Sequence, residues 1–473
     1  MTDKILNPNS SKYRIQTIND ITKNMNLNPM VDYNNTMTEY YTGQIGRGRD
    51  EKSSSSNTTK KELNKKFQSL ETILKMGTEC NLDYIKSGTT GHVFKLSGKL
   101  ENGNAIECAI KIVAYTRKDE DYGGIYDVKR PENAEQKMTK VLSYFVVKDL
   151  TPHIILPVTT FYTDLKKLTN FFNTKLGIVK KKHYTEKEHV YKLEKDDNEL
   201  KKKYERYLEF LDNYDNEEYH KKASIMISEW ANRGDLLDFL RHNYDDPSMT
   251  LEMWRVIFFQ VLSVLAVILD KYPNFRHNDL KANNLLIHKI DSNVKTWRYP
   301  VGNMFFAVPN IQYMIKLVDF DFSCIPNIVE NSKVEHSWTN RINVHSIQNQ
   351  YYDIHYFFST LIMKGFCPNI MTSSKVPTDV KEFINRVIPE KYRYSSENKK
   401  VVDKKGRILI NDEYTTPIKI LSTDPFFEPF RKNKISSKKE KKTTNSINIL
   451  NYLKNSEENY EESVTYLISK LKK

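Results

Sequence analysis

Paired cysteines and long apolar runs are both scarce in this chain of 473 residues. Its four cysteines are widely scattered and lack metal-binding spacing, which argues against a zinc pattern and favours a reducing, cytosol-like compartment. The longest apolar stretch, residues 256–269, is too short to cross a bilayer and contains Gln260 and Ser263. The first residues also lack the apolar region of a signal peptide. We therefore expect a soluble protein without an integral membrane segment.

Apolar residues are also in short supply, at 39% of the chain against 28% charged residues. Part of the chain is therefore expected to lie outside any core. The formal net charge of +13 would suit acidic partners such as nucleic acid or anionic lipid. Because no arginine-rich or aromatic-interleaved stripe appears, we interpret the lysines as solubilising, and nucleic-acid binding is not indicated.

Composition divides the chain into three parts. Residues 1–75 are rich in Asn, Thr, Ser and Lys and predict a flexible, low-complexity leader, either free or ordered by a partner. Residues 76–434 carry the patterns of a catalytic domain, interrupted at 164–222 by a charged, solvated helical insertion with too few apolar residues for a core. Residues 435–473 predict a basic linker and a C-terminal helical tail.

Periodicity predicts the main elements of the middle part. The β-type runs at 93–96 and 106–113 are separated by turn-forming residues and predict a hairpin. Residues 131–147 and 251–269 have the i, i+3, i+4 apolar spacing of helices. Strand character returns at 223–230.

Residues 277–287 read HNDLKANNLLI and say most about the chemistry. The carboxylate of Asp279 would orient a substrate hydroxyl and accept its proton. The ammonium of Lys281 would neutralise charge on a transferring phosphoryl group, and the amide oxygen of Asn284 would hold a magnesium ion. The run resembles the catalytic loop of protein kinases, H-R-D-L-K-x-x-N, except that Asn278 stands where most of that family has arginine.

The resemblance to protein kinases implies a fold and two cofactors. It implies a two-lobed α+β fold with a small β-rich N-lobe at about 76–231 and a larger, mostly helical C-lobe at about 232–434. ATP and Mg²⁺ are the implied cofactors.

A glycine pair lies where a first hairpin would cover the nucleotide. In the kinase pattern G-x-G-x-x-G-x-V, Gly88 and Gly91 match the second and third glycines and Val93 matches the valine, while Lys86 takes the first glycine position. Glycines let the backbone approach phosphate closely. Taken alone, the pair also fits an ordinary turn.

A lysine that would contact the α- and β-phosphates follows on the next strand. Residues 108–111, CAIK, resemble the kinase V-A-I-K strand and place Lys111 in that role, with Ala109 beside the adenine. Because a charge on an apolar strand needs a partner, a helical carboxylate should face it. We choose Glu135 on the predicted helix, with Glu132 as the alternative.

Residues 225–231, IMISEWA, resemble the passage from strand to hinge that binds adenine. By that resemblance Glu229 and Ala231 supply backbone contacts, and Asp235 reaches the ribose. Leu286 would lie below the base, opposite Val93 and Ala109. A buried strand followed by a turn predicts the same pattern. Ser228 would be the gatekeeper residue.

A second magnesium ligand is expected after the catalytic loop. Residues 315–321, IKLVDFD, look like the strand and D-F-G motif of kinases, with Asp321 in place of glycine. We predict Asp319 as the ligand, with Asp321 as the alternative register. Residues 289–309 lengthen the connection and are interpreted as an insertion.

Asp353 begins an apolar helix at the place where kinases have a buried aspartate that supports the catalytic loop. A helix N-cap is the alternative role, and the two are compatible. No A-P-E motif separates Asp319 from Asp353. Together with Asn278, this argues against control by an activation-loop phosphate, and Asn278→Arg is expected to leave basal activity largely intact.

The 277–279 loop, the run at 319–323 and the helix start at 351–358 together look like the divergent serine/threonine kinases of poxviruses and other large DNA viruses. The resemblance implies transfer from ATP to serine or threonine of a protein, favoured over tyrosine because Lys281 follows the base by two residues. It also implies viral structural proteins as possible substrates and a possible place in the virion. The alternative is a pseudokinase or nucleotide-binding scaffold without turnover, suggested by the departures at 86, 278 and 321.

Overall fold

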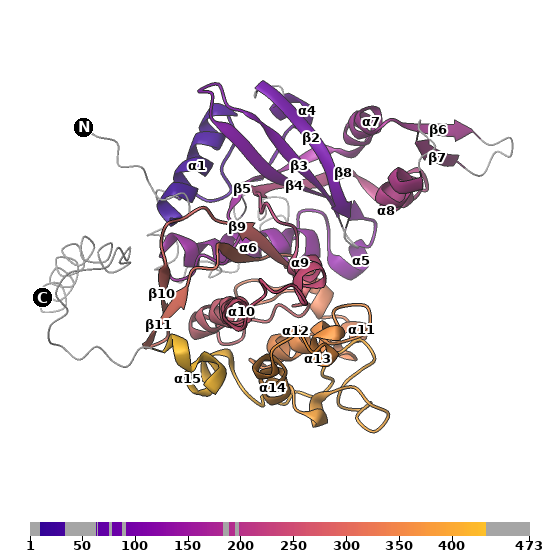
Figure 1. Ribbon diagram of the computed structural model, residues 1–473. Helices are drawn as coiled ribbons and strands as arrows, with labels where there is room; N and C mark the ends of the chain where they lie inside the picture. Colours follow the sequence, from indigo (N-terminus) through magenta and orange to yellow (C-terminus); the bar gives the residue numbers. More distant parts are fainter. Residues whose placement is uncertain are drawn as a thin grey trace, which may run out of the picture.

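The computed structural model combines a β-sheet built by the first half of the chain with a mostly helical second half, an α+β fold as predicted (Figure 1). The structure describes residues 10–33, 63, 65–74, 78–87, 91–182, 189–193 and 198–431. The predicted basic linker and helical tail at 435–473 lie outside these residues.

The sheet has six strands in the order β1-β5-β8-β4-β3-β2, with β1 parallel to β5 and the other pairs antiparallel. In β3 the side chains alternate between buried and partly exposed, so one face covers a core. The predicted hairpin is confirmed because β3 pairs antiparallel with β4. The strands are β1 Lys66–Phe67, β2 Thr78–Ser87, β3 His92–Lys99, β4 Ala105–Thr116, β5 Pro157–Asp164 and β8 Tyr219–Glu229.

Two long helices frame the region between the sheet and the helical half. Helix α6, Pro131–Val147, begins with proline in its first turn, as predicted. Helix α10, Leu251–Lys271, begins at Thr250, whose side chain accepts from the backbone of Met253. Among the described helices, α10 alone is long and apolar enough to cross a membrane. However, 78% of its apolar window is buried, as in the core helix of a globular protein.

The helical half packs around α10. The segment predicted as an insertion at 289–309 contains the antiparallel hairpin of β10 and β11. Its Tyr299 and Phe306 rings each lie 5.2 Å from the Phe259 ring of α10, so the hairpin joins the core. The remaining elements here are α9 Leu236–Asn243, β9 Leu285–Lys289, β10 Thr296–Val301, β11 Met304–Pro309, β12 Tyr313–Leu317, α11 Ser337–Asn340, α12 Tyr352–Leu361, α13 Asn369–Thr372, α14 Thr378–Val387 and α15 Pro417–Thr423, with 3-10 turns at Ala282–Asn284, Ser332–Val334, Glu390–Tyr392 and Pro425–Phe430.

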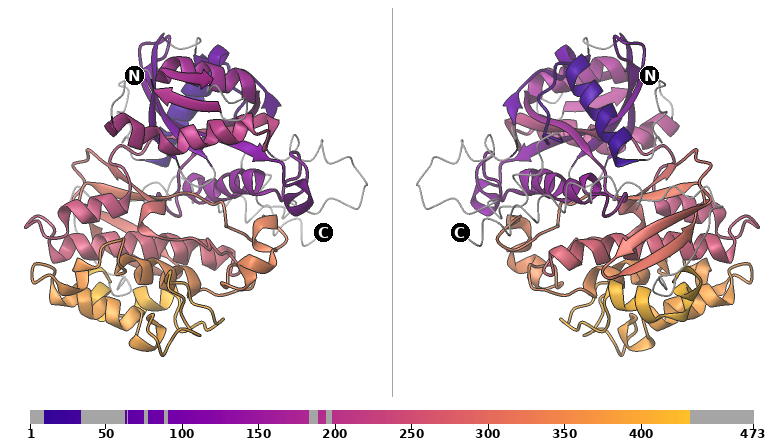
Figure 2. Two further views of the ribbon diagram at one scale, coloured as in Figure 1. Left: turned by 90° about the vertical axis from the view of Figure 1, so that its right-hand side faces the viewer. Right: turned by 90° about the vertical axis from the view of Figure 1, so that its left-hand side faces the viewer.

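The prediction that residues 1–75 form a flexible leader is wrong for residues 10–33. Helix α1, Ser11–Asn24, packs beside α6 and β5 (Figure 2) and buries Ile18 and Ile21. Its Arg14 forms a two-pronged ion pair with Glu229, with both N–O distances at 2.7 Å. The composition of residues 1–75 does not predict this helix, because only a few apolar residues and one ion pair hold it against the sheet and α6. A short helix, α4 Leu70–Leu74, lies within the same predicted leader.

The 164–222 segment is an excursion from the sheet, but the prediction that it is solvated is wrong on one side. It contains α7 Leu165–Leu176, β6 Ile178–Lys182, β7 His189–Leu193 and α8 Asn198–Asp215. Phe172 of α7 stacks on Phe94 of β3 at 4.2 Å, and Tyr207 of α8 lies 5.2 Å from His92. Aromatic side chains thus attach a charged segment to strand β3 of the sheet.

Arg14→Ala should reduce the free energy of unfolding by about 3–5 kcal/mol, because it leaves the Glu229 carboxylate, which is 18% exposed, without its guanidinium partner. Urea unfolding followed by circular dichroism measures the change. Lys12→Ala on the exposed side of α1 is the matched control and should change stability by less than about 0.5 kcal/mol. Equal effects of the two variants would contradict the role given to Arg14.

Candidate active site

A buried carboxylate fixes the backbone of the predicted catalytic loop. Asp353, at the start of α12, accepts from the backbone N–H of His277 at 2.7 Å and of Asn278 at 2.9 Å. Burial raises the pKa of Asp353, and these bonds and the nearby cations oppose that shift. Asn278 has a φ of +64°, a conformation rare for a residue other than glycine. The two bonds therefore hold the loop in a strained shape that presents the next residue, Asp279.

Three side chains converge on the carboxylate of Asp279. The Nζ of Lys281 lies 2.8 Å from Oδ2, and the side-chain amide of Asn284 donates to the same oxygen at 3.2 Å and to the Asp279 carbonyl at 2.9 Å. The Nη2 of Arg407 donates to Oδ1 at 2.7 Å. The structure thus brings the predicted residues Asp279, Lys281 and Asn284 together and adds an arginine that the motif analysis missed.

Lys111 joins the sheet to the predicted metal-binding strand. Its Nζ lies 2.5 Å from Glu135 of α6 and 3.0 Å from Asp319. Burial by itself would lower the pKa of Lys111, but the two carboxylates outweigh burial and raise it. Burial raises the pKa of Glu135 to about 7 although Lys111 opposes this. The alternative partner, Glu132, binds Arg130 instead at 3.1 Å.

Asn284 and Asp319 are suited to hold a magnesium ion together with nucleotide phosphates. The backbone N–H of Val318 donates to the carbonyl of Asn284 at 3.2 Å, so the two residues lie on adjoining segments. An amide oxygen and a carboxylate are the hard ligands that magnesium prefers. Among the described residues, no group of three or more His, Cys, Asp and Glu forms a metal cluster. An ion held by Asn284 and Asp319 would take its remaining ligands from phosphate and water.

The predicted adenine side lies between β4, β8 and β9. Ala109 of β4 pairs with Ser228 of β8, and Val93 pairs with Lys111. The backbone N–H of Glu229 already donates to Leu156, so an adenine contact from Glu229 would use its carbonyl. Ala231 is buried just beyond the end of β8.

The expected ribose-binding residue has a different partner here. Asp235 caps α9 by accepting from the backbone of Asp238 at 3.0 Å, and it forms a bridge with Leu286. Its other oxygen accepts from Nζ of Lys86 at 2.7 Å. Because Lys86 is half-exposed and stands at a glycine position of the kinase pattern, ribose would have to share or displace this contact.

The two predicted glycines differ in what the structure says about them. Gly88 lies outside the described residues. At Gly91 an added Cβ would meet the Ile112 carbonyl and Cγ2 of Val113, each at 2.9 Å. The close approach of β4 therefore requires glycine at 91, independently of any phosphate contact.

Neutral hydrogen bonds replace the missing arginine of the catalytic loop. The side-chain amide of Asn278 donates to the carbonyls of Phe322 at 3.0 Å and His345 at 3.2 Å. Both acceptors belong to the segment that follows Asp319. Asn278 is fully buried. Arginine at 278 would have to enter this filled space and would break both bonds. The expectation that Asn278→Arg leaves basal activity largely intact stays a prediction, and these contacts weigh against it.

Asp321, which replaces the usual glycine, anchors the same segment through an ion pair with Lys333. The amide of Asn331 donates to the carbonyls of Asp321 at 2.9 Å and Ser323 at 3.2 Å. Nζ of Lys333 also lies 4.0 Å from the centroid of the Phe322 ring. The departure from glycine thus supplies a charge that holds residues 331–333 against the turn with the predicted metal ligand.

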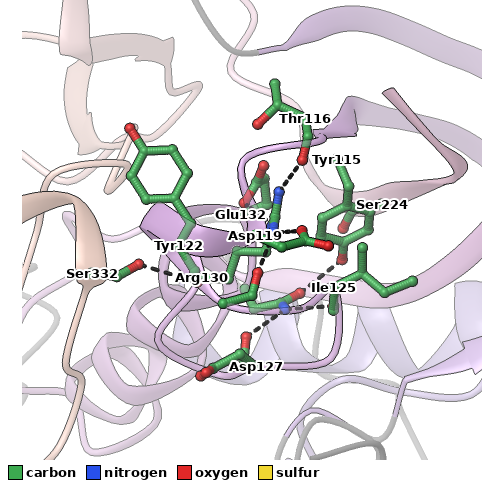
Figure 3. Close-up of polar contacts among 12 residues, drawn as sticks. Tyr115, Thr116, Asp119, Tyr122, Ile125, Asp127, Arg130, Glu132, Ser224 and Ser332 are labelled. Carbon is green, nitrogen blue, oxygen red and sulfur yellow. Dashed lines mark hydrogen bonds and ion pairs between the residues drawn. The ribbon is translucent and has the colours of Figure 1, made fainter. Parts of the chain in front are cut away.

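The segment after Asp319 also contacts the loop between β4 and α6. Figure 3 shows Arg130 in this loop, where it binds Asp119 at 2.8 Å and the carbonyl of Thr116. The backbone N–H of Ser332 donates to the carbonyl of Lys129 at 2.8 Å. Since this loop leads into α6, which carries Glu135, the contacts tie the segment after Asp319 to the helix that pairs with Lys111.

The α+β fold and the arrangement of the site are compatible with a protein kinase. The model of the poxvirus serine/threonine protein kinase family matches residues 157–419, and the chain belongs to that family. A protein of Acanthamoeba polyphaga mimivirus with the provisional name of a serine/threonine-protein kinase is 43% identical over 425 residues, which cover 89% of this chain and 80% of that protein. A second mimivirus protein with the same provisional name is 28% identical over 37% of this chain and 47% of its own length. An uncharacterized mimivirus protein is 24% identical over 63% of this chain and 29% of its own length.

Lys333→Ala should loosen the segment after Asp319, because it leaves the buried carboxylate of Asp321 without a cation. We expect the free energy of unfolding to fall by about 3–5 kcal/mol and limited proteolysis to cut faster within residues 321–336. Lys375→Ala removes an exposed pair with Asp245 and should cost less than about 1 kcal/mol. Unchanged protease resistance in Lys333→Ala would exclude the anchoring role.

Proposed function

We propose that this chain is a serine/threonine protein kinase that transfers the γ-phosphoryl group of ATP to a protein hydroxyl. One observation carries the proposal: Asn284 binds Asp279 and accepts from the backbone of Val318, and the next residue, Asp319, pairs with Lys111, at the junction of the sheet and the helical half. We also propose the two-lobed organisation, with an N-lobe at 76–231 to which α1 is attached and a C-lobe at 232–434.

Each residue of the set has a distinct task in the proposed reaction. Lys111, held by Glu135, would bind the α- and β-phosphates. Asn284 and Asp319 would hold Mg²⁺, which neutralises phosphate charge when bound. Asp279 would orient the substrate hydroxyl and take its proton as the oxygen forms a bond to the γ-phosphorus.

The remaining steps concern the leaving group and the nucleotide. The bond between the γ-phosphorus and the bridging oxygen breaks and ADP leaves, while Lys281 would stabilise charge on the transferring group. The adenine would lie between Val93 and Ala109 on one side and Leu286 on the other, with backbone contacts from Glu229 and Ala231. Asp235 would approach the ribose after release from Lys86.

Lys281 and the resemblance to viral kinases support a proposal for the substrate and the location of the protein. Lys281, two residues after Asp279, favours serine or threonine over tyrosine by analogy with that kinase class. Viral structural proteins are the proposed substrates and the virion a proposed location, both by analogy with the kinases of large DNA viruses. The four cysteines are free thiols, which fits a reducing compartment.

The second candidate is a nucleotide-binding scaffold without turnover, which the departures at 86, 278 and 321 favour. Those positions do not carry the chemistry, whereas every residue assigned to base, phosphate and metal is present. We therefore place the active kinase first.

Asp279→Asn should lower phosphoryl transfer by about 100- to 10,000-fold, because an amide cannot accept the hydroxyl proton. Transfer is measured with radiolabelled ATP and Mg²⁺ on generic acidic and basic proteins, and phosphosites are mapped by mass spectrometry. Binding of a fluorescent ATP analogue is the control and should stay within about threefold of wild type. Equal label transfer by both proteins, or labelling on tyrosine alone, would overturn the proposal.

A further inference from the structure

Arg407 lies against the proposed catalytic base although it belongs to no kinase motif in the sequence. Besides its bond to Asp279, its Nη1 donates to the backbone carbonyl of Asn278 at 2.7 Å and to the hydroxyl of Tyr352 at 3.1 Å. The guanidinium also lies over the ring of Tyr356, 4.2 Å from the centroid. A planar fork of donors thus holds both the backbone and the side chain of the catalytic loop, a geometry that lysine cannot reproduce.

The turn that carries Arg407 is itself fixed in place. Oδ1 of Asp403 accepts from the backbone N–H groups of Lys405 and Arg407, each at 2.8 Å. Gly406 has a φ of +81° and packs so closely that an added Cβ would meet Sδ of Met363 at 2.7 Å. Arg407 therefore extends from a turn that Asp403 and Gly406 hold in shape, and its side chain packs against the catalytic loop.

The two cations on Asp279 differ in their freedom to move. The side chain of Lys281 is 24% exposed and that of Arg407 is 9% exposed. In the proposed reaction Lys281 turns toward the transferring phosphoryl group, which takes its Nζ away from Asp279. Arg407 has no second task and would stay in place. It would then be the cation that keeps the carboxylate correctly oriented as the substrate hydroxyl arrives.

We propose that Arg407 is a positioning residue that acts through Asp279 and supports phosphoryl transfer without touching ATP or substrate. This inference rests on the proposed kinase function. Orientation of a reacting group to within about 1 Å affects rates by roughly 100-fold, so the loss of Arg407 should lower kcat by about that factor. The KM for ATP should change little, because the phosphate-binding residue Lys111 belongs to the sheet.

A double-mutant cycle tests whether Arg407 acts through Asp279. Arg407→Ala, Asp279→Asn and the double variant are compared in steady-state transfer from radiolabelled ATP. We expect Arg407→Ala to lower kcat about 100-fold alone and less than about threefold in the Asp279→Asn background. Added methylguanidinium should restore part of the activity of Arg407→Ala and none in the double variant.

Lys405→Ala is the matched control, because it removes an exposed positive charge from the same turn and should keep activity within about twofold of wild type. Arg407→Lys keeps the charge and is the substitute if Arg407→Ala fails to fold by circular dichroism; it should recover only part of kcat. Additive losses in the cycle, or a wild-type kcat in Arg407→Ala, would overturn the role of Arg407 and leave the kinase proposal standing. A wild-type protein without Asp279-dependent transfer would overturn the kinase proposal as well.

Discussion

The loop that carries the proposed base in the candidate active site depends on the carboxylate of Asp353. A buried carboxylate is costly unless hydrogen bonds compensate it, and here the backbone N–H groups of His277 and Asn278 provide them. These bonds stabilise the positive φ of Asn278, which directs the following residue, Asp279, toward Lys281 and Arg407. The ring of His277 in turn contacts the Val318 carbonyl at 3.1 Å, next to the predicted metal ligand. The start of α12 thus fixes the loop of the proposed base, and His277 of that loop contacts the residue before the predicted metal ligand.

The segment after Asp319 is held by contacts that require no added phosphate. In kinases controlled by activation-loop phosphorylation, a phosphate and an arginine order this segment. Here Asn278 binds it through neutral hydrogen bonds, Asp321 binds it through Lys333, and Ser332 attaches it to the loop before α6. All these contacts are made by the unmodified chain. They support the loop before α6, and therefore the pairing of Glu135 with Lys111, without a phosphate.

Local patterns predict the elements well and the contacts between distant elements poorly. The helix at 131–147, the first hairpin and α10 follow from periodicity and turn chemistry, which act over a few residues. The pairing of Lys111 with a helical carboxylate follows from the need to neutralise a buried charge. The contact of Arg407 with Asp279 joins residues 128 positions apart. The turn at 403–407 shows only a glycine and charges, so it does not indicate what its arginine binds.

The burial of α1 and of the aromatic side chains of α8 was missed for a related reason. Both helices are poor in apolar residues, and composition averages hide a single buried stripe. In α1 the ion pair of Arg14 with Glu229 brings a charged side chain into the core beside the predicted hinge, and hydrophobicity alone does not register this attachment. In α8, Tyr207 contacts His92 of β3 from within a highly charged sequence.

The departures from the kinase pattern share a physical property that bears on activity. Lys86 pairs with Asp235, Asn278 bonds to the segment after Asp319, and Asp321 pairs with Lys333. At the half-exposed position of Lys86, a replacement that binds nothing would cost little. Each replacement here instead has a partner on another segment of the site. The contacts of Asn278 and Asp321 are buried, and that of Lys86 joins the edge of the glycine-loop strand to the predicted ribose residue. The candidate site is thus held together by bonds that differ from those of the kinase pattern.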